Sequence, residues 1–374
     1  MPEEKRKPDI RFAGFTDAWE QRKLNTFSTY SSSPLTNNDI NENGEYDLYD
    51  ANGIVGKTNK SPNIVNYISI IKDGAGVGRV RKLPKNTSIL GTMGAIIPNN
   101  SNYDFLYVLL ENTEFNKLTS GGTIPHIYFK QYSEELYYIP ELSEQQQIGA
   151  YFRTLDHLIT LHQRKCESLK NVKKSLLEKM FPQNGSNFPE IRFAGFTDAW
   201  EQRKLGELSS TTIGEFVIKT KQDPNSPYPV FNGGVSNTGF YNEFNKEGDH
   251  IIISARGANA GYINIYKGKY WAGNSCYSVS INESSKQNID FIYQEMKRNQ
   301  HLFTDYQQSA SIPAVSKADV EKFCIQFPSI NEQQQIGTFF KNLDDLIALH
   351  QRESKLTYCL SHILTLLSAD KEET

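Results

Sequence analysis

The sequence of 374 residues predicts an α+β protein built from two similar halves. Each half should contain a β-rich domain and a long helix, and we expect the two helices to pack as an antiparallel coiled coil with pseudo-two-fold symmetry. Three observations predict this fold: a short motif that occurs twice, a helical segment that occurs twice, and a variable block of about 120 residues between them in each half. Such a pattern is typical of a duplicated chain rather than of one large core.

The short motif is IRFAGFTDAWEQRKL, which stands at Ile10–Leu24 and returns unchanged at Ile191–Leu205. Its aromatic residues Phe12, Phe15 and Trp19 are apolar enough to be packed inside a domain. A structural role and a role in binding a shared partner therefore both remain open, and we expect the motif to mark the start of each half.

The helical segment SEQQQIGAYFRTLDHLITLHQRK at Ser143–Lys165 matches NEQQQIGTFFKNLDDLIALHQRE at Asn331–Glu353. Apolar residues follow each start at spacings of three and four, which is typical of coiled coils. The first seam is Ile148, Phe152, Leu155, Ile159, His162, Cys166, Leu169, Lys173, Leu176 and Met180. The second begins Ile336, Phe340, Leu343, Ile347 and His350, and we expect it to continue through Leu356, Leu360, Ile363 and Leu367.

Pro182 should end the first helix after about 38 residues, or roughly 57 Å. Two such narrow apolar seams favour pairing of the helices, although each helix could instead pack only on its own block. The predicted divisions are 1–142, 143–181, 182–330 and 331–374.

Each variable block shows strand-like segments, such as NYISIIK and HIIISAR, bounded by glycine, asparagine and proline. One helix per block is expected, at Asp104–Lys117 and at Asp290–Phe303. Landmarks persist between the blocks: KDGAGVG at Lys72 corresponds to ARGANAG at Ala255, and GTIP at Gly122 corresponds to ASIP at Ala310. The blocks should therefore share a scaffold and differ in surface.

Composition excludes several classes of protein. The chain has no apolar run of roughly 20 residues, and its mean hydropathy is -0.55, so we expect a cytoplasmic protein. Four scattered cysteines without a CxxC pair, and histidines without ligand spacing, predict reduced thiols and no metal site.

Catalytic patterns are weak. Ala51–Thr58 fits a permissive phosphate-loop pattern with Lys57, but the residues after it do not favour a helix, and Phe240 takes the place of Lys57 in the second block. No methyltransferase, hydrolase or nuclease motif stands out. We expect no catalysis and no cofactor in this chain.

A polar binding surface remains, and its composition indicates nucleic acid. Residues 57–85 carry a net charge of +6 although the whole chain carries -3. Asparagine can read adenine edges, and arginine and lysine can hold phosphates. The candidate DNA-binding residues are Asn52, Lys57, Thr58, Lys60, Lys72, Arg79, Arg81, Lys82 and Lys85 in the first block, and Asn232, Asn237, Tyr241, Lys246, Arg256, Asn259, Lys267 and Lys269 in the second.

The segment PEIRFAGFTDAWEQRKLGEL at Pro189–Leu208, the pair Ile312–Pro313, and P-x-x-x-EQQQIG before a long helix together resemble the specificity subunit of type I restriction-modification systems. The resemblance covers essentially the whole chain. It implies that each block is a target recognition domain reading one half of a bipartite, asymmetric DNA site. The paired helices would set the distance between the half-sites.

The resemblance also implies partners. Two modification subunits, which bind S-adenosylmethionine and methylate adenine, would dock on the conserved regions, and two restriction subunits would use ATP and magnesium to cleave DNA. A stand-alone DNA-binding regulator is the alternative, and an ATP-binding enzyme is a third hypothesis.

Two features depart from the family. The second helix ends SHILTLLSADKEET without the closure KKSLLEKMFPQ of the first. The counterpart of Arg256 in the first block is Asp73 or Lys72, so the charged residue that approaches DNA there stays open.

Overall fold

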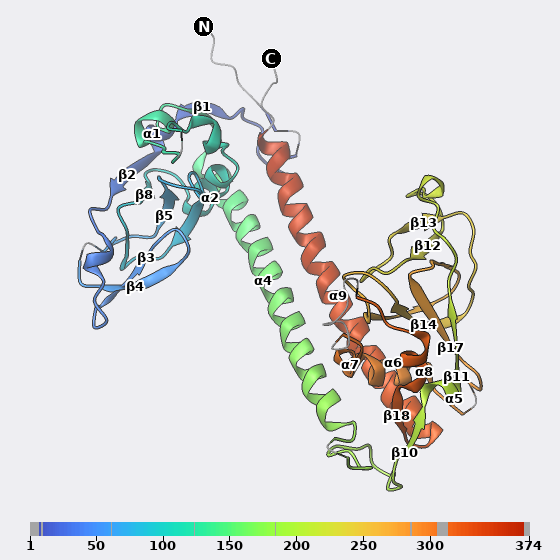
Figure 1. The fold of residues 1–374 in the computed structure, drawn as a ribbon. Helices are drawn as coiled ribbons and strands as arrows, with labels where there is room; N and C mark the ends of the chain where they lie inside the picture. Colours follow the sequence, from blue (N-terminus) through green and yellow to red (C-terminus); the bar gives the residue numbers. More distant parts are fainter. Residues whose placement is uncertain are drawn as a thin grey trace. The chain divides into compact units, whose positions relative to one another are not determined.

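The computed structural model describes residues 7–8, 10–60, 62–122, 124–183, 185–284, 286–304 and 313–369. The chain forms two compact units. Unit 1 runs to Gln163 and includes the residues from Arg352 onward, and unit 2 comprises Arg164–Gln351. The division falls inside the two long helices, one in each half of the chain, which Figure 1 labels α4 and α9. Each unit therefore contains part of both long helices.

Unit 1 is built on a four-stranded antiparallel sheet in the order β2 (Ser28–Ser32), β8 (Met93–Pro98), β5 (Tyr67–Ile71), β6 (Val80–Leu83). A three-stranded sheet follows the order β4 (Ile54–Thr58), β3 (Tyr46–Tyr49), β7 (Thr87–Ile89). β1 (Glu20–Lys23) pairs with β9 (Leu136–Ile139). The helices of the block are α1 (Leu24–Phe27), η1 (Asn37–Asp39), α2 (Tyr103–Glu111), η2 (Phe115–Leu118) and α3 (Phe129–Tyr132).

Unit 2 repeats this order of elements. Its four-stranded sheet is β11 (Ser209–Ile213), β17 (Cys276–Ile281), β14 (Asp249–Ser254), β15 (Ile263–Lys267). Its three-stranded sheet is β13 (Gly239–Tyr241), β12 (Tyr228–Phe231), β16 (Trp271–Ala272), and β10 (Glu201–Lys204) pairs with β18 (Cys324–Phe327). The helices are α5 (Leu205–Leu208), η3 (Lys219–Lys221), α6 (Ile289–Arg298), α7 (His301–Thr304) and α8 (Lys317–Lys322). The predicted α+β fold with a duplicated scaffold is confirmed.

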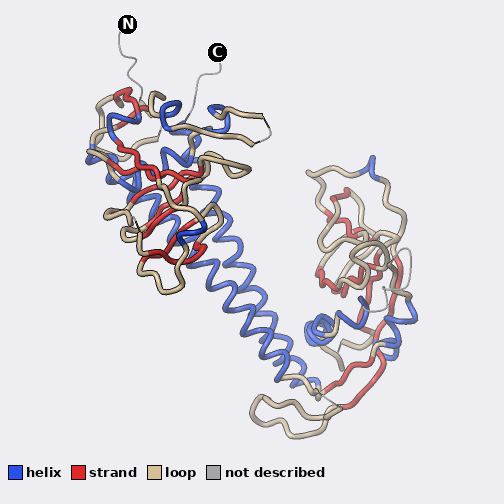
Figure 2. The backbone as a smooth tube through the Cα atoms, turned by 60° about the vertical axis from the view of Figure 1, so that its left-hand side comes forward, coloured by secondary structure: helices blue, strands red, loops and turns tan. Residues whose placement is uncertain are grey.

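The core of each unit lies between the four-stranded sheet and one helix. In unit 1, Ile68, Ile96 and Phe105 are fully or almost fully buried together, which places α2 against the sheet. The opposite face of α2 contacts the long helix through Val108 and Phe152. α2 is thus the layer that connects the sheet to the helical segment, and α6 has the same place in unit 2. Figure 2 distinguishes the helices, in blue, from the strands, in red.

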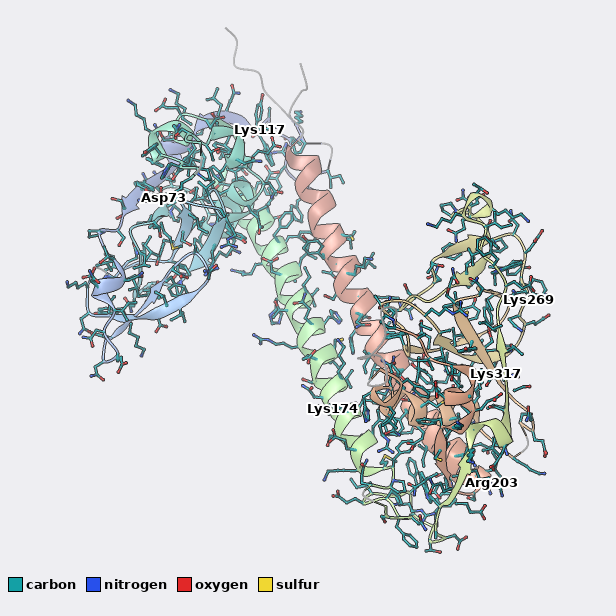
Figure 3. The ribbon with its side chains drawn as sticks, viewed as in Figure 1. Asp73, Lys117, Lys174, Arg203, Lys269 and Lys317 are labelled. Carbon is teal, nitrogen blue, oxygen red and sulfur yellow. The ribbon has the colours of Figure 1, made fainter. Side chains whose placement is uncertain are left out.

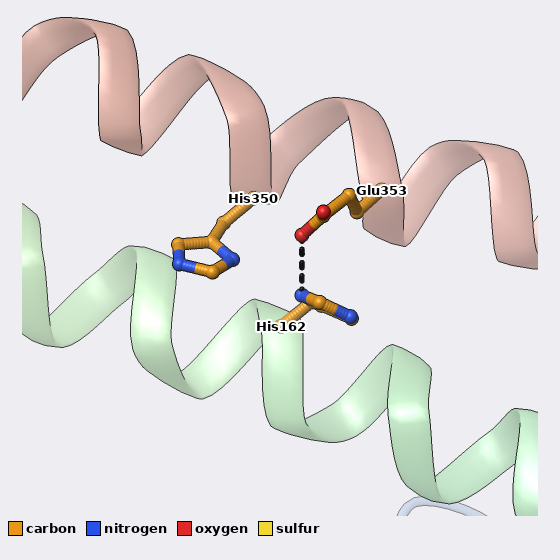
Figure 4. Close-up of side chains that lie close together, drawn as sticks. All are labelled: His162, His350 and Glu353. Carbon is orange, nitrogen blue, oxygen red and sulfur yellow. Dashed lines mark ion pairs between the residues drawn. The ribbon is translucent and has the colours of Figure 1, made fainter.

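The two long helices, α4 (Leu142–Lys179) and α9 (Ile330–Ala369), run antiparallel within each unit. In unit 1, His162 Nδ1 lies 3.0 Å from a carboxylate oxygen of Glu353 (Figure 4). In unit 2, Lys173 Nζ lies 2.6 Å from Asp344 Oδ1. Also in unit 2, the ring of Phe181, just after α4, lies 6.0 Å from that of Phe340. The residue number on α9 therefore falls as that along α4 rises, so the pairing is antiparallel. Every predicted seam position of α4 is buried or partly buried, which confirms the seam.

The predicted continuation of the α9 seam is wrong at Leu356 and Leu360, whose side chains are 63% and 45% exposed. The side chains of Ile363 and Leu367 lie outside the described residues. Spacings of four and three from His350 lead instead to Ser354 and Thr357, which are partly buried. The helical period, rather than the nearest leucines, decides which residues face α4.

The single helix predicted near the end of each block is interrupted. α2 ends at Glu111, where the amide of Asn112 donates to the carbonyl of Val108 at 2.7 Å. α6 ends at Arg298, and Asn299 donates in the same way to the carbonyl of Glu295 at 3.1 Å. Asparagine side chains that bond nearby carbonyls compete with helix continuation, which explains why η2 and α7 form separate turns.

The repeated motif fastens each block to the start of its long helix. Arg11 donates from Nε and Nη2 to the carboxylate of Glu144 at 2.7 and 2.6 Å, and Arg192 makes both bonds to Glu332 at 2.7 Å. Both glutamates are fully buried. These bonds raise the pKa of both guanidinium groups. Trp19 and Trp200 are also buried, so the structural role of the motif is established.

Among the described helices, none is both long enough and apolar enough to cross a membrane.

Candidate nucleic-acid interface

In each unit a glycine turn joins a central strand of the four-stranded sheet to the neighbouring edge strand, β5 to β6 in unit 1 and β14 to β15 in unit 2. Gly74 and Gly257 have φ angles of +90° and +89°, a conformation that favours glycine. The amide of Gly74 donates to the carbonyl of Pro125 at 3.0 Å, and the amide of Gly257 donates to that of Pro313 at 3.0 Å. The proline near the end of each block therefore fixes the position of the turn. The rest of the GTIP and ASIP motifs lies partly outside the described residues.

The residue before the glycine differs in charge. Isolated bridges join Asp73 to His126 and Arg256 to Ala314, so Asp73 is the positional counterpart of Arg256. Asp73 Oδ1 lies within hydrogen-bonding distance, 2.6 Å, of Nδ1 of His126. Figure 3 labels Asp73. Arg256 is exposed and has no side-chain ion pair or hydrogen bond with the described residues. At the same backbone position, unit 1 thus presents a paired acid and unit 2 a guanidinium group.

A loop from the three-stranded sheet lies beside this turn. In unit 1 it is residues 50–53, between β3 and β4, which we call loop L1. In unit 2 it is residues 232–238, between β12 and β13, which we call loop L2. Both loops are held to the four-stranded sheet by side chains. Arg79 and Arg81 donate to the carbonyl of Ala51 in L1, and Asn264 donates to the carbonyl of Val235 in L2 at 2.8 Å.

Several predicted DNA-binding lysines are already engaged in ion pairs. Lys82 lies 2.9 Å from Asp104, and Lys267 lies 2.8 Å from Asp290; both acids are in the first turns of α2 and α6. Lys60 pairs with Asp39 at 2.8 Å. Lys269, labelled in Figure 3, lies 3.6 Å from Glu247 and over the ring of Phe244. Lys246 donates to the hydroxyl of Thr212 at 3.0 Å.

Thr58 and Tyr241 do not fit the predicted surface, because both are buried. They occupy equivalent positions, since Thr58 faces Tyr46 across the β3–β4 pair and Tyr241 faces Tyr228 across the β12–β13 pair. The Tyr241 hydroxyl donates to the carbonyl of Ile218 at 2.7 Å. Strand alternation turns these two side chains inward, so their burial argues against direct contact with DNA.

The other predicted residues divide into two groups. Asn232 accepts from the amide of Ser275 at 3.0 Å, and Asn237 donates to the carbonyl of Gly239 at 3.5 Å, so both mainly shape L2. The second group makes no side-chain hydrogen bond or ion pair within the part of the chain that the structure describes. Its members are Asn52, Lys57, Lys72, Lys85, Arg256 and Asn259. All except Lys72 are exposed, and these residues remain the candidates for direct contact.

The phosphate-loop pattern has a structural explanation. Residues 54–58 form strand β4 rather than the start of a helix, and Lys57 lies opposite Asp47 in the β3–β4 pair. Phe240 holds the same position in unit 2, opposite Pro229. A nucleotide cradle needs backbone amides at a helix start, and this strand offers none.

Sequence reasoning missed the residues that support loop L2 in unit 2. Ser254 donates from its hydroxyl to the carbonyl of Gly234 at 2.9 Å, and Asn264 donates to the carbonyl of Val235. Neither residue was among the candidates. The available signal was position: Asn264 lies opposite Ile252 on β14, as Arg81 lies opposite Ser69 on β5. An alignment of strands, rather than of charges, would have found it.

Comparison with known proteins identifies the scaffold. The family described as "Type I restriction modification DNA specificity domain" matches residues 16–171 and again residues 197–357. The chain belongs to this family. As a specificity subunit with two target recognition domains, it recognises DNA sequence within a restriction-modification system.

Relatives and one solved structure agree with this assignment. A protein of Mycoplasma genitalium named as a type I specificity subunit is 23% identical over 369 residues, covering 95% of each chain. The specificity subunit of the type I restriction enzyme MjaVIII of Methanocaldococcus jannaschii is 27% identical over 53% of this chain and 51% of its own length. The crystal structure of a type I restriction-modification S subunit from M. genitalium superposes with a TM-score of 0.81 at 18% identity, covering 98% of this chain and 100% of that chain. This specificity subunit therefore shares its whole fold with a solved structure.

Proposed function

We propose that this specificity subunit is non-catalytic, and that each unit reads one half of a bipartite, asymmetric DNA site. The observation that carries the proposal is that the two units share the same supporting ion pairs but differ in side chain at equivalent positions of the surface. The Arg11–Glu144 and Arg192–Glu332 bonds are the same in both units, whereas Lys57 corresponds to Phe240 and Asp73 to Arg256. Different surfaces on one scaffold are what two different half-sites require.

The long helices are proposed to set the distance between the half-sites. α4 has 38 residues and α9 has 40. At 1.5 Å per residue, each can span more than the roughly 34 Å between half-sites one helical turn apart. The helices belong to the constant part of the repeat, which suits a function that all recognition domains share.

Two methyltransferase subunits are proposed to dock on equivalent positions of the two helices. Leu161 on α4 and Leu349 on α9 occupy the same place in the helical repeat and are 49% and 45% exposed. Exposed leucines within near-identical segments favour a protein contact that occurs twice. S-adenosylmethionine would be bound by these partners, and ATP and magnesium by two restriction subunits that join them. The complex would act in the cytoplasm, where its DNA is.

The decisive experiment is sequencing of methylated bases in a host that carries this chain and its methyltransferase partner. We expect one asymmetric bipartite motif with a fixed spacer. Exchange of residues 25–141 for the corresponding block of another family member should change one half-site and leave the other intact. A change in both halves would contradict the assignment of one half-site to each unit.

The same measurement separates the alternative of a stand-alone regulator. A regulator would bind its site without the methyltransferase and would leave no methylation motif. A matched pair of substitutions, Leu161→Glu and Leu349→Glu, should abolish methylation while DNA binding by the isolated chain persists. Methylation that survives both changes would contradict docking at these positions.

The spacing function can be tested by adding one helical turn to both helices at the same level. Lys170 and Ile347 line one cleft of unit 2, so insertions beside them keep the helices in register. One turn of about 5.4 Å should lengthen the spacer by one or two base pairs of roughly 3.4 Å. The matched control is an equal insertion in the linker near Gly185, which should leave the spacer unchanged. If the helix insertions also leave it unchanged, the helices do not set the spacing.

A further inference from the structure

The basic strand beside loop L1 suggests a task other than phosphate binding. Arg79 is exposed and Arg81 partly buried, and both guanidinium groups point to the same acceptor, the carbonyl of Ala51. The Arg81 bond measures 3.4 Å. Hydrogen bonds from a charged donor are stronger than neutral ones. Two such donors on one loop carbonyl fix the loop relative to the four-stranded sheet.

Hydrogen bonds within loop L1 also hold its backbone. The carboxylate of Asp50 accepts from the amides of Asn52 and Gly53 at 2.7 and 2.9 Å, and the amide of Asp50 donates to the carbonyl of Gly53 at 2.8 Å. With its backbone held on both sides, the loop carries the exposed side chain of Asn52, which makes no hydrogen bond with the described residues. A fixed backbone with an unengaged amide at its tip is suited to reading a base edge.

In unit 2, neutral side chains hold the corresponding loop L2. Asn264 occupies the register position of Arg81 and donates to the carbonyl of Val235, while Ser254 donates to the carbonyl of Gly234 at 2.9 Å. Neutral side chains thus replace cations at this position without loss of the loop contact. Arg81 and Asn264 share the hydrogen bond to the loop but not the positive charge. We therefore infer that this position serves mainly to hold the loop and not to bind a phosphate.

We propose that Arg79 and Arg81 are positioning residues that hold loop L1 so that Asn52 reads a base edge in one half-site, and that Asn264 holds loop L2 for the other. This inference rests on the proposed function of the two units as half-site readers. Because asparagine pairs with two atoms of adenine in the major groove, the base read by Asn52 is expected to be adenine.

The test uses the chain assembled with its methyltransferase subunits and a duplex that carries the bipartite site found by methylated-base sequencing. Fluorescence anisotropy gives the Kd for this duplex and for duplexes with one base pair changed in either half-site, at several salt concentrations. The block exchange described above assigns each half-site to its unit. Loss of a phosphate contact reduces the magnitude of the slope of log K against log salt by about 0.9, whereas loss of a positioning residue leaves the slope unchanged.

For the double variant Arg79→Ala with Arg81→Ala, we expect discrimination in the half-site of unit 1 to fall about ten-fold. Discrimination in the other half-site and the salt slope should stay as in the unaltered complex. Asn52→Ala should lose discrimination at a single base pair of the same half-site. The matched control is Lys85→Ala, which should weaken binding to all duplexes equally and lower the slope by about 0.9.

A salt slope lowered by about two with discrimination intact would show that the arginines contact phosphates, and it would overturn the proposal. If the alanine variant does not fold, Arg79→Lys with Arg81→Lys decides the question. Lysine keeps the charge, so it should keep the slope and lose discrimination, and retained discrimination would overturn the proposal. Failure of the proposed function gives a different result, because the unaltered complex would then not discriminate between duplexes at all.

Discussion

The helix that joins each sheet to the long helices has a buried polar network in unit 2 where unit 1 has an apolar cluster. α2 presents Val108 to Phe152 and Leu155, which form a small apolar cluster. α6 instead has Gln294 donating to Asp344 at 2.8 Å, and a buried Glu295 that accepts twice from Arg298 at 3.0 Å. Burial raises the pKa of Glu295 and lowers that of Lys297 to about 8. The same backbone arrangement therefore accepts two kinds of packing.

The segment just after α4 accounts for part of this difference. Phe181 is fully buried in unit 2, where its ring lies 5.4 Å from that of Phe291 and 5.8 Å from that of Trp200. The guanidinium carbon of Arg298 lies 5.2 Å from the centre of the Phe181 ring. At the offset of 188 residues that relates the two helical segments, position 369 is an alanine and position 181, just after α4, is this phenylalanine. The two units have thus diverged in their interiors as well as in their loops.

The largest expected effect comes from Phe181→Ala. Removal of a fully buried aromatic ring should destabilise unit 2 by about 4 kcal/mol. Hydrogen exchange should rise in β14 and stay unchanged in β5, and this contrast is the measurement. The control Phe188→Ala removes a ring that is 54% exposed and should have little effect. Equal destabilisation of β5 would show that the units do not unfold separately.

Loss of a buried carboxylate should affect both units alike. Glu144→Ala and Glu332→Ala each leave a mostly buried guanidinium without its partner, at a cost of about 3 kcal/mol in the unit concerned. Chemical denaturation of the two variants checks this. Glu201→Ala, which removes a carboxylate that is 72% exposed, is the control. A difference above about 2 kcal/mol between the two variants would contradict the equivalence of the motifs.

The lowered pKa of Lys297 predicts a pH response that is specific to unit 2. The unfolded chain binds a proton at this lysine up to about pH 10.5, whereas the folded chain releases it near pH 8, so stability should rise between these values. Because the side chain is partly solvated, we expect a gain of about 1 kcal/mol. Lys297→Met should remove this rise, and Lys286→Met, at an exposed pair, should keep it. A rise that persists in Lys297→Met would assign it to another group.

The smallest effect is expected at Leu356. Its exposed position predicts that Leu356→Gln changes the free energy of unfolding by less than about 0.5 kcal/mol. Ile347→Gln, in the buried part of the same helix, should cost about 3 kcal/mol. Thermal unfolding of the two variants compares them. A large loss of unfolding free energy in Leu356→Gln would mean that Leu356 packs in the seam, contrary to its exposed position in the structure.

The duplicated fold could be predicted because the repeated motifs and the three- and four-residue spacing of apolar residues can be seen in the sequence itself. The α4 seam from Ile148 to Met180 follows from spacing alone. The same reasoning failed for α9, because the prediction chose the apolar residues Leu356 and Leu360, which are exposed. The three- and four-residue spacing leads instead to Ser354 and Thr357, which are partly buried. Apolar character indicates burial only where the geometry already agrees.

The candidate surface was predicted by residue type, and type does not reveal partners. Nothing local distinguishes Lys82, which pairs with Asp104, from Lys85, which is exposed and has no such pair within the described residues. The paired acid is distant in the chain and is brought close only by the packing of α2 on β6. Charge clusters therefore locate a surface more reliably than they identify its contacts.

The division of α4 and α9 between the units has a consequence for how the chain is made. Unit 1 is completed by residues from Arg352 onward, which leave the ribosome only after all of unit 2. Until then α4 lacks the part of α9 that belongs to unit 1, including Glu353, which lies 3.0 Å from His162, so completion of the unit depends on contacts between distant parts of the sequence. We expect nascent chains that stop before Arg352 to depend on chaperones, although the sheet of unit 1 has already been synthesised.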